Sequence, residues 1–150
     1  MTFDTFIQKG KHPVCEDAIL AFNKQSLSFQ GIALSDGCSS SNDSHLGSTL
    51  LTLEINRFIQ TWSWTDIRSV PSSELNQTMI YIIKHLMKEY FLDSSAFDAT
   101  LGLAYKFHRY YNITLFGDGI VGIKLKNKPW EYHVVDYDHN APFYISYGAD

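Results

Sequence analysis

A chain of 150 residues, 45% of them hydrophobic and 15% aromatic, can fold as one domain with a real core, which excludes an intrinsically disordered chain. The net charge of −4 and the lack of a basic run argue against a nucleic-acid partner. The sequence has no signal-peptide pattern and no stretch as apolar as a membrane span, so we expect a soluble, cytoplasmic protein with no membrane partner.

The first third of the chain predicts two strands, a polar loop and a helix. The strands are expected at residues 17–23 and 29–35, because both runs are short and apolar. Residues 36–44 consist of small and polar turn formers and are expected to form a loop. The helix is expected from residue 44 to about residue 60, because its apolar side chains recur at helical spacing.

A second helix is expected to begin near Pro71, which is followed by two serines that favour a helix start. After residue 93 the pattern changes to aromatic and β-branched runs separated by turns, which predicts strands. These strands are expected at residues 99–107, 111–116, 120–125, 131–137 and 142–147. The order of strands, helices and strands predicts an α+β fold with helices packed on a sheet, rather than a doubly wound parallel sheet.

Three acidic clusters stand beside ends of the predicted strands. They are Glu16-Asp17, Asp36-Gly37 and Gly117-Asp118-Gly119. Mg²⁺ and Mn²⁺ prefer carboxylate and carbonyl oxygens, and a glycine after a carboxylate lets the backbone approach an ion. Each cluster taken alone is also a common turn sequence. A small α+β binding domain in which these are only turns therefore remains an alternative.

In their order along the chain, these clusters resemble the protein phosphatase 2C family. That family opens with a Glu-Asp pair before a strand, continues with an apolar strand ending in Asp-Gly, and later has a Thr-Leu strand and a hairpin with Gly-Asp. The matching segments here are Cys15-Glu16-Asp17-Ala18, Gly31–Gly37, Ala99-Thr100-Leu101 and Asn112–Gly119. The serine-rich loop after Asp36 is similar to that of a bacterial branch. The resemblance covers about residues 10 to 125.

The resemblance implies a fold of two antiparallel sheets packed face to face, with helices outside. It also implies hydrolysis of phosphoserine and phosphothreonine in phosphoprotein substrates with two Mn²⁺ or Mg²⁺ ions. Carried over to this chain, it makes Asp36 the bridge between the ions, the Gly37 carbonyl a ligand of one and Glu16 a ligand of the other. Asp17 would orient metal-bound water, so that Asp36 and Asp17 are the expected catalytic residues. Asp118 would hold a further, weaker ion.

The chain departs from this pattern where the family has a phosphate-binding arginine. His12 stands at that position with Lys11 beside it, and both are candidate phosphate contacts. Neither offers the bidentate fork of arginine. The alternative reading, that both are surface residues of a turn, stays open.

A second departure concerns the late aspartates that supply the family's remaining metal ligands. Asp136, Asp138 and Asp150 are the only aspartates after Asp118, and none has the expected context. We therefore expect residues 1–150 to form a single, partial domain that lacks its C-terminal third, with an open sheet edge that favours a homodimer. The same departure supports an alternative function, a catalytically inactive phosphatase-like module that binds a protein partner.

Overall fold

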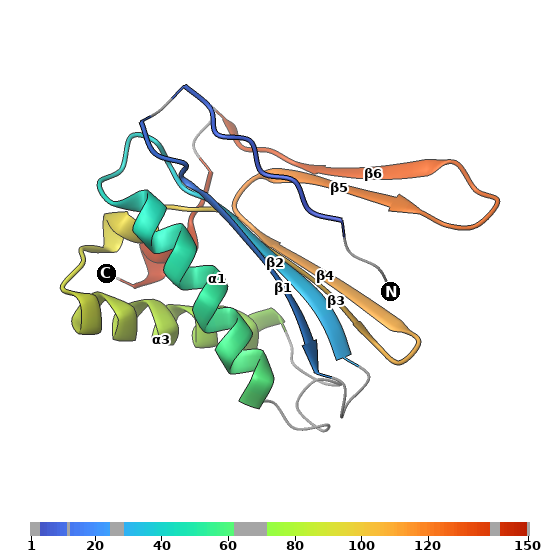
Figure 1. Ribbon diagram of the computed structural model, residues 1–150, viewed down its shortest axis with the longest axis horizontal. Helices are drawn as coiled ribbons and strands as arrows, with labels where there is room; N and C mark the ends of the chain where they lie inside the picture. Colours follow the sequence, from blue (N-terminus) through green and yellow to red (C-terminus); the bar gives the residue numbers. More distant parts are fainter. Residues whose placement is uncertain (1–3, 12, 25–28, 62–71, 139–141, 150) are drawn as a thin grey trace.

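The computed structural model describes residues 4–11, 13–24, 29–61, 72–138 and 142–149, and two antiparallel sheets organise these residues (Figure 1). The larger sheet has the strand order β1-β2-β3-β4, and the smaller is the hairpin β5-β6. The strands are β1 Asp17–Lys24, β2 Phe29–Asp36, β3 Leu101–Phe107, β4 Tyr110–Phe116, β5 Gly119–Lys124 and β6 Trp130–Val135. The α+β class expected from the sequence is confirmed.

In the described part of the chain, two long helices and two short 3₁₀ helices accompany the sheets. They are α1 Ser44–Thr61, α3 Ser72–Tyr90, η2 Ser94–Phe97 and η4 Ile145–Gly148. The expected helix start at Pro71 lies outside the described residues, and α3 is described from Ser72 onward. No helix in the described part of the chain is both long and apolar enough to cross a membrane.

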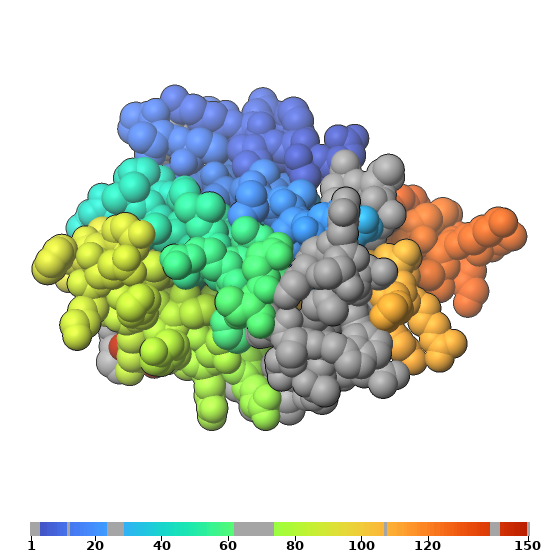
Figure 2. Space-filling view, turned by 60° about the horizontal axis from the view of Figure 1, so that its bottom comes forward, coloured from blue at the N-terminus to red at the C-terminus, as the bar shows by residue number. Residues whose placement is uncertain are grey.

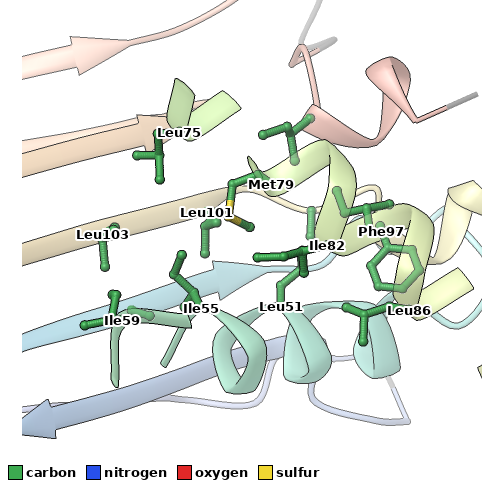
Figure 3. Close-up of a cluster of buried hydrophobic side chains, with 14 of the residues drawn as sticks. Leu51, Ile55, Ile59, Leu75, Met79, Ile82, Leu86, Phe97, Leu101 and Leu103 are labelled. Atoms are coloured by element: carbon green, nitrogen blue, oxygen red, sulfur yellow. The ribbon is translucent and has the colours of Figure 1, made fainter. Parts of the chain in front are cut away.

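The core lies between one face of the larger sheet and the two long helices. Strand β2 shows why the sheet packs this way, because its buried and less buried residues alternate with a period of two. Figure 3 shows side chains from α1, α3 and β3 meeting in one cluster. The labelled residues are Leu51, Ile55, Ile59, Leu75, Met79, Ile82, Leu86, Phe97, Leu101 and Leu103, all of them buried. Figure 2 shows α1 and α3 side by side on this face.

The opposite face of the larger sheet is apolar and only partly covered. Its residues include Ile19, Ile32, Leu34, Ile113 and Leu115, and they share a cavity of about 300 Å³ with the start of β5. Leu34 and Ile113 remain 42% and 45% exposed. The hairpin β5-β6 diverges from β4 and protrudes from the molecule (Figures 1 and 2). The fold is therefore a partial sandwich, with two strands in the described part of its second layer.

The strand predicted at residues 142–147 is wrong, because the structure has the 3₁₀ helix η4 there. Tyr144, Ile145 and Ser146 are buried in succession, whereas a strand would bury alternate residues. The hydroxyl of Ser146 donates a hydrogen bond of 2.7 Å to Asp98 Oδ1. A tight helical turn brings all three side chains inward and gives this hydroxyl its partner.

Gly47 in α1 provides the first test of the packing. A Cβ at this position would collide with the backbone carbonyl of Ala96 in η2. Gly47→Ala gains about 1 kcal/mol of helix propensity. The overpacking costs more, so we expect the free energy of unfolding to fall by about 2 kcal/mol. Urea unfolding measures this change.

Gly10→Ala is the matched control, because no atom lies within 4 Å of a Cβ built on Gly10. We expect its unfolding curve to coincide with that of the wild type. Equal stability of the two variants would contradict the close approach of α1 to η2.

Candidate metal and phosphate site

Two carboxylates face each other where β1 begins and β2 ends. Asp17 and Asp36 are direct partners in the antiparallel register of these strands. Ser35 is fully buried on the helix-facing side of the sheet, so Asp36, the next residue, points to the other side. Two like charges directly opposite on one face repel each other. The fold therefore concentrates negative charge at this corner of the sheet.

Burial and the neighbouring acids both act on the pKa of Asp36. Burial, a hydrogen bond with Asp17 and the charges of Asp17, Asp118 and Glu16 together raise the pKa of Asp36 from 3.8 to about 6. Each of these effects favours the protonated carboxyl. All three acidic clusters of the sequence thus act at one point, although they are separated by as many as 102 positions.

A cavity of about 320 Å³ lies directly beside this acidic pair. Its wall contains four residues from the start of β1 and the end of β2, namely Glu16, Asp17, Asp36 and Gly37. The rest of the wall comes from Gln8, Gly10, Val14, Cys15 and Ser39. The N-terminal segment thus closes one side of a space in which a small anion and a cation can meet the carboxylates.

Thr100 fixes the backbone of Asp36 from the neighbouring strand. The backbone N–H of Thr100 donates to the Asp36 carbonyl at 2.9 Å, and the Asp36 N–H donates to Thr100 Oγ1 at 3.2 Å. Ser35 Oγ donates to the Thr100 carbonyl at 2.7 Å. Thr100 itself is only 8% exposed. These bonds hold the carboxyl-bearing end of β2 in one position.

The turn that carries Asp118 packs against the same threonine. Gly117 has a φ of 86°, which a residue with a side chain rarely adopts. A Cβ on Gly117 would lie 3.1 Å from Thr100 Cγ2. Glycine therefore allows the turn to approach β3 closely, and this approach places the charge of Asp118 near Asp36.

Gly37 is required for a second close approach. Its N–H donates to the Glu16 carbonyl at 3.1 Å. A Cβ would lie 2.8 Å from that carbonyl oxygen and 2.9 Å from the carbonyl oxygen of Ser44. The Ser48 hydroxyl of α1 donates to the same Glu16 carbonyl. The backbone of Glu16 is thus tied to both the Asp-Gly corner and the helix.

A family model described as Protein phosphatase 2C matches residues 7–143. The chain belongs to the protein phosphatase 2C family. The matched region contains both sheets and all three acidic clusters, and it confirms the family expected from the sequence. Searches among curated proteins and among solved structures gave no match.

The donor set of this phosphatase-family site fits one hard cation in its chemistry. Asp17 and Asp36 offer carboxylate oxygens at a point of excess negative charge, which suits Mg²⁺ or Mn²⁺. Across the described ranges, however, no three side chains of His, Cys, Asp or Glu come close enough together to hold an ion. A complete set of ligands for two ions is not assembled by these residues.

The two candidate phosphate contacts have different outcomes. His12 lies outside the described residues. Lys11 is exposed and follows Gly10, a residue of the cavity wall, but Lys11 is not itself part of that wall. A role for Lys11 or His12 therefore stays a prediction.

Cys38 lies immediately after the Asp-Gly corner, and its surroundings stabilise the thiolate. Burial opposes ionisation, but hydrogen bonds with Ser40, Tyr144 and Ser41 outweigh this effect and lower the pKa of Cys38. The Cys38 Sγ and Ser40 Oγ atoms are 3.1 Å apart. No local pattern predicts the tyrosine contact, because Tyr144 follows more than 100 residues later.

Sequence reasoning missed the structural roles of two residues. The sequence pattern includes Thr100 only in a Thr-Leu pair, although its hydroxyl accepts a hydrogen bond from the backbone of Asp36. Asp98 belongs to no predicted cluster, although its carboxylate accepts hydrogen bonds from Ser41 and Ser146. An acid two residues before the Thr-Leu pair was the only available signal.

The raised pKa of Asp36 predicts a dependence of stability on pH. Ionisation of Asp36 costs stability as the pH rises through 3.8, and this cost is complete above about 6. Asp36→Asn removes the charge. Because water screens the partly exposed carboxyl, we expect the free energy of unfolding to rise by only about 1 kcal/mol at pH 8. The gain should shrink toward pH 4.

Urea unfolding in metal-free buffer at pH 4 and pH 8 checks this expectation. Glu89→Gln is the control, since Glu89 pairs with His85 on α3 and is not part of the cavity wall. A loss of stability at pH 8 in Asp36→Asn, or a gain of equal size at both pH values, would show that Asp36 is not held under repulsion.

Proposed function

We propose that this chain is a metal-dependent protein phosphatase that hydrolyses phosphoserine and phosphothreonine in proteins, with Mn²⁺ or Mg²⁺ at the Asp17–Asp36 corner. Membership of the protein phosphatase 2C family supports the reaction class. The observation that carries the proposal is the convergence of Glu16, Asp17 and Asp118 on Asp36. The nearby negative charges disfavour ionisation of Asp36, and a bound cation would offset that repulsion.

The chain's own residues have distinct parts in this proposal. Asp36, the Gly37 carbonyl and Glu16 would hold the ions, and Asp17 would orient the attacking water. Asp118 would supply a carboxylate for a further, weaker ion. The bound ions supply positive charge that neutralises the phosphate and makes water a better nucleophile at neutral pH.

The cavity beside the carboxylates suits a phosphorylated side chain. Its volume of about 320 Å³ exceeds that of a phosphate group, and Gln8 and Ser39 provide polar wall atoms. The exposed ammonium of Lys11 and the side chain of His12 are the proposed cationic contacts of the phosphate at the N-terminal side. The substrate in this proposal is a phosphoprotein segment that reaches the cavity from solvent.

Hydrolysis of a phosphoserine peptide with and without Mn²⁺ tests the function. We expect turnover in Mn²⁺ that is lost with EDTA and falls by at least about 100-fold in Asp36→Asn, because this change removes a metal ligand. Glu89→Gln changes an acid to its amide outside the cavity wall and should keep full activity. Phosphate release measured under saturating Mn²⁺ gives the comparison.

A second candidate is a catalytically inactive phosphatase-like module that binds a protein partner. The observation that favours it is the absence, among the residues described, of any three side chains able to hold an ion. The same assay separates the two candidates. A folded wild type with no more turnover than Asp36→Asn would favour the inactive module, and turnover that depends on Asp36 would eliminate it.

We also propose a homodimer through an open sheet edge, together with a cytoplasmic location. Strand β6 is the strongest candidate for the edge, because all six of its residues are exposed and an unpaired strand edge is a template for another strand. Light scattering over a 100-fold range of protein concentration should show the mass rising from monomer to dimer. A constant monomer mass would contradict the homodimer.

A further inference from the structure

We infer that Asp98 is a positioning residue for the candidate metal site, which it supports by holding the loop Cys38–Ser41 in place. This inference rests on the proposed function, because the loop follows directly on the Asp36-Gly37 corner. Asp98 belongs to none of the three acidic clusters. It lies just after η2 and two residues before Thr100.

The Asp98 side chain joins two segments that are far apart in the sequence. Its Oδ2 atom accepts a hydrogen bond of 2.9 Å from Ser41 Oγ, and its Oδ1 atom accepts one of 2.7 Å from Ser146 Oγ. Ser146 is 1% exposed and lies in η4. A carboxylate is suited to this position because each oxygen can accept from a different hydroxyl.

The backbone of Asp98 holds the other end of the same loop. The Cys38 N–H donates to the Asp98 carbonyl at 2.7 Å, and the Ser41 N–H donates to the Cys38 carbonyl at 3.0 Å. The loop is thus attached to Asp98 at both its first and its last residue. Ser39, between them, is part of the cavity wall.

These contacts connect Asp98 with Asp36 through a short path. The Asp98 carbonyl holds Cys38, which lies two residues after Asp36. Thr100, two residues after Asp98, binds the backbone of Asp36 itself. Loss of the Asp98 carboxylate frees the Ser41 end of the loop. The part of the cavity wall formed by Ser39 then loses a fixed position relative to Asp36, while the acids themselves are unchanged.

Comparison of the two serines separates positioning from general support of the fold. Ser41→Ala removes the bond to the loop, and Ser146→Ala removes the bond to η4, each by deletion of one hydroxyl. If Asp98 positions the site, Ser41→Ala should reproduce the effect of Asp98→Ala on Mn²⁺ binding. Ser146→Ala should lower thermal stability and leave Mn²⁺ binding within two-fold of the wild type.

The experiment combines Mn²⁺ titration, followed by electron paramagnetic resonance, with amide hydrogen exchange at Cys38 and Ser41, followed by NMR. We expect Asp98→Ala and Ser41→Ala each to weaken Mn²⁺ binding about 10-fold, the size typical of residues that support metal ligands. Both should accelerate exchange of the two amides. The double variant should bind Mn²⁺ no more weakly than Asp98→Ala, because both changes remove one interaction.

Unchanged amide exchange and unchanged Mn²⁺ affinity in Asp98→Ala would overturn the inference, as would an effect of Ser146→Ala equal to that of Ser41→Ala. If Asp98→Ala does not fold, Ser41→Ala against Ser146→Ala decides alone. Failure of the proposed function has a different signature, in which wild type and Asp36→Asn bind Mn²⁺ alike. The exchange of the Cys38 and Ser41 amides then still decides whether Asp98 holds the loop.

Discussion

The hydrogen bonds between Thr100 and the end of β2 are the constraint on which the candidate site depends. The regular pairing of β2 with β3 ends at Leu34 and Gly102. Beyond that point Thr100 continues the contact, because it exchanges hydrogen bonds with the backbone of Asp36 and its carbonyl accepts one from the Ser35 hydroxyl. An isolated bridge between Gly37 and Ala99 follows. A residue without a hydroxyl would leave the Asp36 N–H without this acceptor. Strand alternation and the register with β1 aim Asp36 at Asp17, and Thr100 fixes the backbone that carries Asp36 and contacts the Gly117 turn.

At this site the fold holds a carboxyl group where its ionisation is unfavourable. Burial and three neighbouring acids disfavour the charged form of Asp36, and nothing in a stable fold requires such an arrangement. The core of α1, α3 and β3, with fully buried side chains such as Leu51 and Leu101, supplies the stability that tolerates it. Like charges kept together at the edge of a cavity are typical of a binding or catalytic site rather than of structural support.

The sequence predicted the elements whose pattern is local and missed those that depend on distant partners. The alternation in β2 and the helical spacing in α1 are visible in short windows, so the sequence predicts the bounds of these two elements to within about two residues. The 3₁₀ helix η4 could not be predicted in this way, because the Ser146 hydroxyl donates inward to a carboxylate 48 residues earlier. The role of Thr100 was hidden for the same reason, since its hydroxyl serves a backbone 64 residues away. The joint action of the acidic clusters could be expected only from their order, not from the spacing of any one of them.

A bound cation would reverse the sign of the interactions that shape this corner. Glu16, Asp17 and Asp118 now repel the charge of Asp36, but each would be attracted to an ion that Asp36 holds. Asp118 is exposed and stands in a turn between two glycines with positive φ, so the turn can follow such an attraction at little cost in strain. The described carboxylates therefore do not need to be within ligand distance of one another before the ion arrives. Metal affinity and the position of the β5-β6 hairpin are then linked, because the same turn carries Asp118 and begins β5.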